Sequence, residues 1–310
     1  MSALVKRYEE TYSKHKKSYD REKSILQGIR GELGQLFVRE VDGPAVHRWY
    51  RGLTESKKLS AGTAVRHFNV MHHMMEKAST LWSKETGLDR NPADLIEVCR
   101  PDDQRERYLS GEEIVALKAN LDQKMHRADS REINRTFFRL RMIVLIALTT
   151  GMRMGEVSDL VWSDLRYSER LIAVRSKLKG GKIRYVPMTP ELAEELRRYP
   201  VEIGEGKLFP LRQDSKGERQ RVEHSFATIL KLAGISGFRF HDLRHTFASW
   251  YMMNGGDLYE LAKILGHSNI RMTERYAKLG KTHIARTGDT ARGMWKLMAG
   301  EKGEQANVAV

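Results

Sequence analysis

Apolar residues recur at helical spacing through much of this 310-residue chain, and this periodicity constrains its fold more than any other feature. The longest stripe follows Ser60, a residue type that caps helix N-termini, and it consists of Phe68, Met71, Met75, Ala78 and Trp82. Two shorter stripes precede it, formed by Leu26, Ile29, Leu33 and Leu36 and by Val46, Trp49, Tyr50 and Leu53. The pattern predicts a small helical domain in the first third of the chain.

The pattern breaks between residues 89 and 107. Pro92 and Pro101 interrupt helix formation there, and the charged run over 100–107 favours solvent. A chain of this length is typical of two domains. We therefore predict a helical domain over residues 1–98, a linker over 99–107, a second domain over 108–300 and a flexible tail over 301–310.

The second domain begins with a helix signal and contains one strand signal. Ser110 and Glu113 have the spacing of a capping box, and a long apolar helix is predicted to end at Gly151. The β-prone runs 171–175 and 183–187 flank a glycine pair, which predicts a hairpin. The expected fold class is mainly α with a small β-hairpin or sheet.

Five polar segments follow one another in this domain. They are Thr-Thr-Gly-Met-Arg-Met-Gly-Glu over 149–156, Lys179, His-Asp-Leu-Arg-His over 241–245, Leu-Gly-His over 265–267, and Tyr276. Breaking a phosphodiester bond without a metal requires a nucleophile, cations that neutralise the developing charge and an acid for the leaving oxygen. Together the segments offer all three.

This ordered series resembles the tyrosine recombinase, or phage integrase, family over roughly residues 107 to 298. The His-x-x-Arg-His and Leu-Gly-His…Tyr elements are specific at this separation, whereas Gly-x-Arg-x-x-Glu alone is a weaker signal. The family's active site contains two arginines, a lysine, two histidine-class residues and a nucleophilic tyrosine. The resemblance implies Glu156 and His245 as supporting residues, and as catalytic residues Arg153, Lys179, His241, Arg244, His267 and Tyr276.

Each implied role has a chemical reason. Ionising the Tyr276 hydroxyl at pH 7 costs about 4 kcal/mol unless cations, expected to be Arg153 and Arg244, lower that cost. His241, Arg244 and His245 are spaced to share one helix face, which suits a phosphate clamp, although His245 could equally be a packing residue. His267 would hydrogen-bond the scissile phosphate. A metal site is the competing interpretation, but no carboxylate-rich ligand set accompanies the histidines, so no metal or cofactor is predicted.

The lysine assignment rests on spacing. In the family the catalytic lysine lies in the hairpin some eight residues before the proline of a Val-Pro pair, and Lys179 has this relation to Pro187. Its ammonium would protonate the departing 5′ oxygen, and Lys177 is the alternative. Five further cations are candidate DNA contacts: Lys57, Lys58, Arg66, Lys177 and Lys182.

The positive net charge and the family resemblance both indicate a nucleic-acid partner. With 54 Lys and Arg against 40 Asp and Glu, the formal charge of +14 favours a polyanion. The resemblance implies a two-domain, C-shaped clamp on double-stranded DNA with inverted-repeat core sites, a homotetramer on two such sites, and accessory DNA-bending or directionality proteins. Residues 290–298 have an apolar face that could pack either on a neighbouring protomer or on the protomer to which they belong.

The sequence and the resemblance also lead to expectations about the cellular compartment and the biological role. Cys99 is the only cysteine, so no internal disulfide can form, and no segment reads as a signal peptide or membrane span. We expect a cytoplasmic protein with no membrane partner. The preferred role is an integrase or excisionase of a mobile element; the alternatives are a dimer-resolving housekeeping recombinase, a type IB topoisomerase and a non-catalytic DNA-binding protein.

Overall fold

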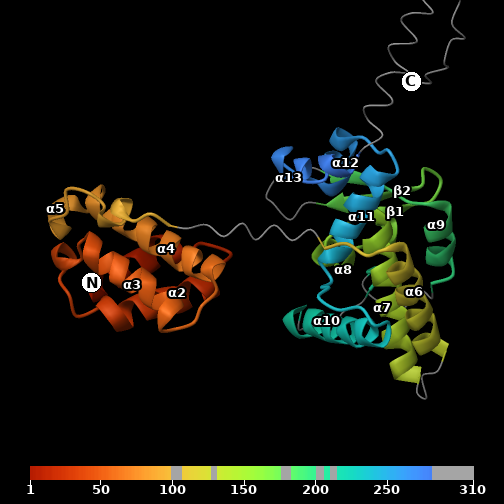
Figure 1. Ribbon diagram of the computed structural model, residues 1–310, viewed down its shortest axis with the longest axis horizontal. Coiled ribbons are helices and arrows are strands. Elements are labelled where there is room, and N and C mark those ends of the chain that lie inside the picture. Colours follow the sequence, from red (N-terminus) through yellow and green to blue (C-terminus); the bar gives the residue numbers. More distant parts are fainter. Residues whose placement is uncertain (99–106, 127–130, 176–182, 200–205, 210–214, 281–310) are drawn as a thin grey trace, which may run out of the picture. The chain divides into compact units, whose positions relative to one another are not determined.

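The computed structural model describes residues 1–98, 107–126, 131–175, 183–199, 206–209 and 215–280 (Figure 1). The chain divides into two compact units, Met1–Arg105 and Glu106–Val310. Three groups of predicted features lie outside the described residues: most of the predicted linker, the hairpin lysines Lys177, Lys179 and Lys182, and the segment 290–298 with the predicted tail.

The first unit is helical. Its elements are α1 (Ser2–Tyr8), a π-helical turn (Glu9–Ser13), α2 (Tyr19–Leu33), α3 (Gly43–Glu55), α4 (Ala61–Ser79), α5 (Ser83–Thr86), and 3₁₀ turns at Val38–Glu40 and Pro92–Leu95. The three predicted stripes form its core, although Leu36 and Trp82 lie just beyond the ends of α2 and α4. Ser60 is at the predicted N-cap, but its hydroxyl contacts the Thr63 hydroxyl at 2.9 Å.

The second unit combines helices with one small sheet. Its helices are α6 (Gly111–His126), α7 (Arg131–Thr150), α8 (Met154–Ser158), α9 (Pro190–Arg197), α10 (Ser215–Leu232), α11 (Asp242–Met253), α12 (Leu258–Leu265) and α13 (Arg271–Glu274). Its 3₁₀ turns are Trp162–Asp164 and Ala277–Leu279, and its strands are β1 (Leu165–Arg166), β2 (Leu171–Arg175) and β3 (Ile183–Pro187). The mainly α prediction is confirmed.

The sheet is antiparallel with the order β1-β2-β3. The predicted hairpin is confirmed as the β2–β3 pair, in which Ala173 faces Tyr185. Strand β1 was not predicted, because two residues are too few to show an alternating pattern; Leu165 pairs with Ile172. The sheet therefore ends on a short edge strand.

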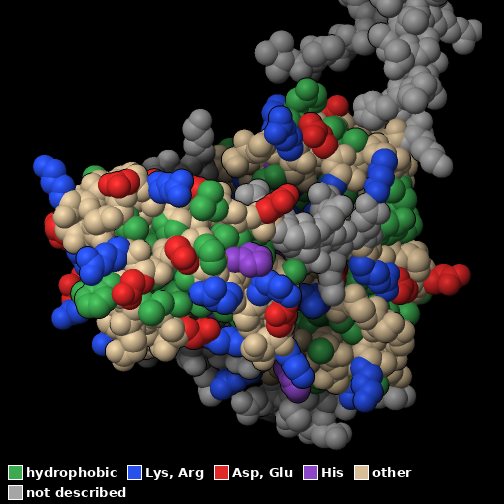
Figure 2. Space-filling model, turned by 60° about the vertical axis from the view of Figure 1, so that its left-hand side comes forward, with side chains coloured by type: hydrophobic (Ala, Val, Ile, Leu, Met, Phe, Trp, Pro, Cys, Tyr) green, Lys and Arg blue, Asp and Glu red, His purple; other side chains and the backbone are tan. Residues whose placement is uncertain are grey.

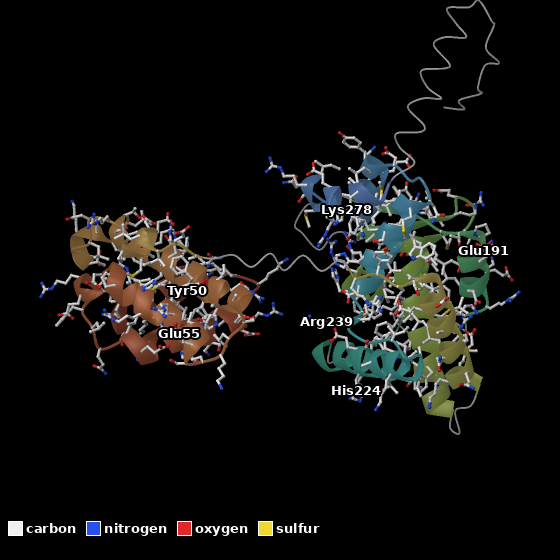
Figure 3. All side chains as sticks on the ribbon, viewed as in Figure 1. Tyr50, Glu55, Glu191, His224, Arg239 and Lys278 are labelled. Atoms are coloured by element: carbon white, nitrogen blue, oxygen red, sulfur yellow. The ribbon has the colours of Figure 1, made fainter. Side chains whose placement is uncertain are left out.

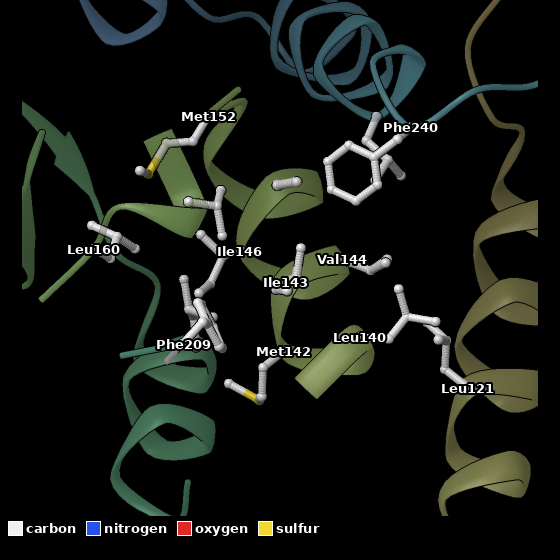
Figure 4. Close-up of a cluster of buried hydrophobic side chains, with 14 of the residues drawn as sticks. Leu121, Leu140, Met142, Ile143, Val144, Ile146, Met152, Leu160, Phe209 and Phe240 are labelled. Atoms are coloured by element: carbon white, nitrogen blue, oxygen red, sulfur yellow. The ribbon is translucent and has the colours of Figure 1, made fainter. Parts of the chain in front are cut away.

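Helix α7 lies at the centre of the second unit's core (Figure 4). Its residues Met142, Ile143 and Ile146 are fully buried, and they pack among side chains from α6, from Phe209 and from the start of α11. This packing fixes the carboxyl end of α7, where the first polar segment begins. No helix in the described part of the chain is long and apolar enough to cross a bilayer.

The start of α6 is tied to α11. Ser110 and Glu113 form the predicted capping box, with backbone-to-side-chain hydrogen bonds of 2.9 and 3.2 Å. The Leu109 backbone N–H donates to the Thr246 hydroxyl at 3.1 Å, and the Trp250 indole N–H donates to the Leu109 carbonyl at 2.9 Å. Helix α11, which carries the His-x-x-Arg-His segment, is thus tied to Leu109, which precedes α6, by two hydrogen bonds.

Candidate active site

The turn after α7 brings the first arginine into the site. Gly151 has φ of +66°, which ends the helix as predicted and which other residues adopt at a cost. A Cβ on Gly151 would lie 2.5 Å from a Phe247 ring carbon and 2.7 Å from a Leu265 methyl carbon. Only glycine lets this turn pack against α11 and α12.

Gly151→Ala is therefore expected to destabilise the second unit by about 2–5 kcal/mol, the sum of left-handed strain and overpacking. Gly206→Ala is the matched control, because Gly206 has φ of +68° but a Cβ added to it would meet no atom within 4 Å. That control should cost only the backbone strain, about 1–2 kcal/mol. Equal shifts of the denaturation midpoint in the two variants would contradict the close-packing argument.

Arg153 and Glu156 are in contact. Arg153 occupies the N-cap position of α8, its backbone N–H donates to Glu156 Oε2 at 2.8 Å, and its Nη1 donates to Oε1 at 3.2 Å. The Arg153 side chain remains 40% exposed. Burial would raise the pKa of Glu156, but hydrogen bonds from Arg184 and from the Arg153 amide outweigh it and lower that pKa. The carboxylate thus stays ionised beside an accessible guanidinium.

Arg244 is the buried cation of the site, with 3% of its surface exposed. Its Nη1 donates to the Gly151 carbonyl at 2.9 Å and its Nη2 to the Leu265 carbonyl at 2.7 Å. Burial lowers the pKa of Arg244 to about 10, and the charge of Arg153 acts in the same direction. Two of its N–H groups thus join the ends of α7 and α12.

His267 follows the end of α12. Gly266 closes that helix with φ of +67°, and His267 Nδ1 lies 2.7 Å from the Thr273 hydroxyl. Burial lowers the pKa of His267 to about 4, with Arg244 and Arg153 adding to the effect. The imidazole is therefore neutral at pH 7 and close to both arginines.

Tyr276 lies between α13 and the following 3₁₀ turn. Its hydroxyl is hydrogen-bonded to Nδ1 of His245, and the two ring centroids are 5.9 Å apart. Its ring packs in a small cluster with Ala248, Met252, Leu261 and Leu265. The contact places His245 directly on the candidate nucleophile.

The hydroxyl of Tyr276 is protonated in this arrangement. Burial raises its pKa, while Arg275 and Arg244 oppose that rise. The Arg275 guanidinium lies 5.9 Å from the ring centroid and acts where Arg153 was expected from the sequence. Burial also lowers the pKa of His245 to about 4, so this imidazole is neutral at pH 7. In the tautomer that carries its proton on Nε2, its Nδ1 accepts the hydrogen bond from the Tyr276 hydroxyl. His241 is exposed, with its ring 5.3 Å from that of His245.

Stability is expected to fall as pH decreases from about 6.5 to 4. His245 and His267 both have folded-state pKa values of about 4 against 6.5 when unfolded, so the unfolded chain binds more protons in this window. Partial exposure limits the loss to about 1 kcal/mol for each histidine between pH 7 and 5. His267→Gln should flatten the dependence of the urea midpoint on pH; an unchanged slope would contradict the neutral state of His267.

Two residues of the site were not predicted from the sequence. Arg184, on β3, binds Glu156, and Arg275 lies against Tyr276. Arg275 could have been found from its place next to Tyr276, whereas no local pattern marks Arg184. Two exposed cations that flank the site in the chain, Arg239 and Lys278, lie on one side of the second unit in Figure 3, opposite Glu191.

The candidate DNA contacts of the first unit are exposed but not equivalent. Lys57 is paired with Glu32, Lys58 has φ of +52°, and Arg66 Nε donates to the Gly62 carbonyl of its own helix at 3.2 Å. On the face of this unit that Figure 2 shows, Lys and Arg side chains are interspersed with Asp and Glu.

Comparison with known proteins gives the same picture. The model of the phage integrase family matches residues 107–283. The putative integrase of Pseudomonas phage Pf1 is 27% identical over 297 residues, which cover 92% of this chain and 77% of that protein. Tyrosine recombinase XerC of Pelobacter propionicus is 26% identical over 286 residues, covering 88% and 87%.

The fold is also similar to that of a solved protein. The integrase of transposon Tn1549, in complex with a circular intermediate DNA, superposes with a TM-score of 0.69 at 18% identity, over 92% of this chain and 98% of that one. The family model covers more than half of the chain and includes all the polar segments described above. The chain therefore belongs to the phage integrase family of tyrosine recombinases.

Proposed function

We propose that this protein is a site-specific DNA recombinase that cuts and rejoins DNA through a 3′-phosphotyrosyl bond to Tyr276. The observation that carries the proposal is the hydroxyl of Tyr276, which is held by His245 in the electrostatic field of Arg244 and Arg275. The segments that resemble the family's motifs, far apart in the sequence, supply Arg153, Arg244 and His267 to the same site.

The chemistry is a transesterification. The Tyr276 hydroxyl gives its proton to Nδ1 of His245, its oxygen attacks the scissile phosphorus, and the bond from phosphorus to the 5′ oxygen breaks. The positive charges of Arg153 and Arg244 neutralise charge on the non-bridging oxygens, and each guanidinium can donate hydrogen bonds to two of these oxygens at once. His241 and His267 hydrogen-bond the phosphate, and Lys179 protonates the leaving oxygen. The phosphotyrosyl bond conserves the energy of the phosphodiester, so the reaction needs neither ATP nor a metal.

The substrate is duplex DNA with inverted-repeat core sites. The first unit acts as a core-binding domain and the second as the catalytic domain. Lys57, Lys58 and Arg66 contact phosphates, which would give salt-sensitive binding with little sequence information. A homotetramer brings two sites together, assisted by accessory DNA-bending or directionality proteins, in the cytoplasm.

The preferred biological role is integration or excision of a mobile element. The likeness to a phage integrase spans 92% of this chain, and the similar fold belongs to a transposon integrase. Dimer resolution is the second candidate, because the likeness to the bacterial recombinase XerC covers this chain almost as fully. Relaxation of supercoils by a type IB topoisomerase would use similar chemistry without exchanging partners.

Covalent capture tests the proposal. The purified protein is incubated with fragmented, nicked host DNA, the mixture is denatured in detergent, and the protein-linked fragments are sequenced. We expect fragments that cluster at one short inverted-repeat site. Scattered fragments would favour the topoisomerase, and an absence of adducts under all conditions would leave a DNA-binding protein without chemistry.

A further inference from the structure

Arg184 on β3 makes three hydrogen bonds in the site, although it lies outside the sequence motifs identified above. Its Nη1 and Nη2 donate to Oε1 and Oε2 of Glu156 at 3.0 and 2.8 Å, and its Nε donates to the Ile264 carbonyl at 3.0 Å. The side chains of Arg184 and Glu156 are 20% and 19% exposed. A fork-to-fork pair of this kind fixes both partners in one orientation.

Glu156 transmits that orientation to Arg153. Each carboxylate oxygen of Glu156 accepts from both arginines: Oε1 from the two Nη1 atoms, and Oε2 from Arg184 Nη2 and the Arg153 backbone N–H. Arg184 therefore holds the Glu156 carboxylate, and this carboxylate in turn binds both the backbone N–H and the side chain of Arg153. With Arg184 removed, Glu156 would keep only its contacts to the backbone N–H and the side chain of Arg153.

The third hydrogen bond of Arg184 ends on the backbone next to the carbonyl that binds Arg244. Ile264, whose carbonyl binds Arg184, precedes Leu265, whose carbonyl binds Arg244. A Cβ on Gly266 would lie 3.0 Å from Arg184 Cδ, so the turn that leads to His267 packs directly on this side chain. Arg184 thus contacts the backbone that places Arg244 and His267.

We propose that Arg184 is a positioning residue that holds Arg153, through Glu156, and the end of α12 in their catalytic geometry. The inference rests on the proposed function. Because Arg184 lies on β3, the first strand after the segment that contains Lys179, it also links that strand to both arginines. A lysine at this position would keep the charge but could not donate to both carboxylate oxygens and the carbonyl in one plane.

The test compares Arg184→Lys and Arg184→Gln with Arg166→Lys. Arg166, on β1 of the same sheet, pairs with Glu169 on the surface and is the matched control. Single-turnover adduct formation is measured on a nicked duplex carrying a captured site, beside equilibrium DNA binding and thermal unfolding. We expect both Arg184 variants to form adduct about 10- to 100-fold more slowly at saturating DNA, because small misplacements cost this much. Their DNA affinity should stay within about threefold, and Arg166→Lys should cleave as the unaltered protein does.

A double variant separates positioning from a general loss of structure. If Arg184 acts through Glu156, adding Arg184→Lys to Glu156→Gln should slow cleavage little beyond the slower single variant. Unchanged cleavage in both Arg184 variants, a loss seen only in DNA affinity, or independent multiplication of the two effects would overturn the inference. No adduct from the unaltered protein would overturn the proposed function, and this inference with it.

Discussion

Tyr276→Phe is expected to abolish the covalent linkage to DNA and to leave DNA affinity within about threefold. The substitution removes only the attacking oxygen, while the ring can still pack against Ala248, Met252 and Leu265. The hydrogen bond lost to neutral His245 should change stability by about 1 kcal/mol. Denaturing gels of labelled duplex measure the adduct, and equilibrium titration of the same duplex measures binding.

Tyr251→Phe is the matched control for this variant. Tyr251 is also a tyrosine of the second unit, its hydroxyl donates to Glu260 at 2.8 Å, and burial raises its pKa to about 12. It should form adduct at the rate of the unaltered protein. An adduct that persists in Tyr276→Phe, at any rate above the background of denatured protein, would remove Tyr276 as the nucleophile.

Arg244→Lys is expected to slow cleavage by about 10²- to 10³-fold, the usual cost of losing a donor to a developing charge. A lysine cannot bridge the Gly151 and Leu265 carbonyls and also present two parallel donors to a phosphate. Leaving a buried carbonyl unpaired should lower stability by about 1–3 kcal/mol. Single-turnover cleavage at saturating DNA, followed at a temperature where the variant is folded, measures the effect.

Arg141→Lys is the control for Arg244→Lys, because it shows what the loss of a buried guanidinium outside the site does to cleavage. Arg141 is also buried, and it binds Glu195 at 2.8 Å as well as Asp122, away from the site. This control should be destabilised to a comparable degree but should cleave at a nearly normal rate. If Arg244→Lys and Arg141→Lys cleave equally fast, Arg244 does not act on the phosphate.

The parts of the fold that follow from short-range patterns were predictable. The helix over 131–150, the glycine that ends it and the capping box at Ser110 each depend on residues within one or two helical turns. The hairpin follows from two β-prone runs around a glycine pair. Strand β1 was missed because it has two residues and owes its conformation to pairing with β2.

The contacts within the site were less predictable, because they join residues that are distant in sequence. Arg184 binds a carboxylate 28 residues before it and a carbonyl 80 residues after it. His245 and Tyr276 are 31 residues apart, so spacing alone left His245 undecided between packing and support. Arg275 is the exception, because it adjoins Tyr276 in the chain and its guanidinium lies 5.9 Å from the centroid of that ring. The choice between Lys177 and Lys179 remains a prediction.

The chemical identity of the DNA linkage tests the central claim most directly. The adduct is trimmed with nuclease and digested with trypsin, which cuts after Arg275 and Lys278, and the peptides are analysed by mass spectrometry. We expect a nucleotide attached through its 3′ phosphate to Tyr276 in the peptide 276–278, and a free 5′ hydroxyl on the other DNA product. A nucleotide on any other residue, or a linkage through a 5′ phosphate, would contradict the proposed mechanism.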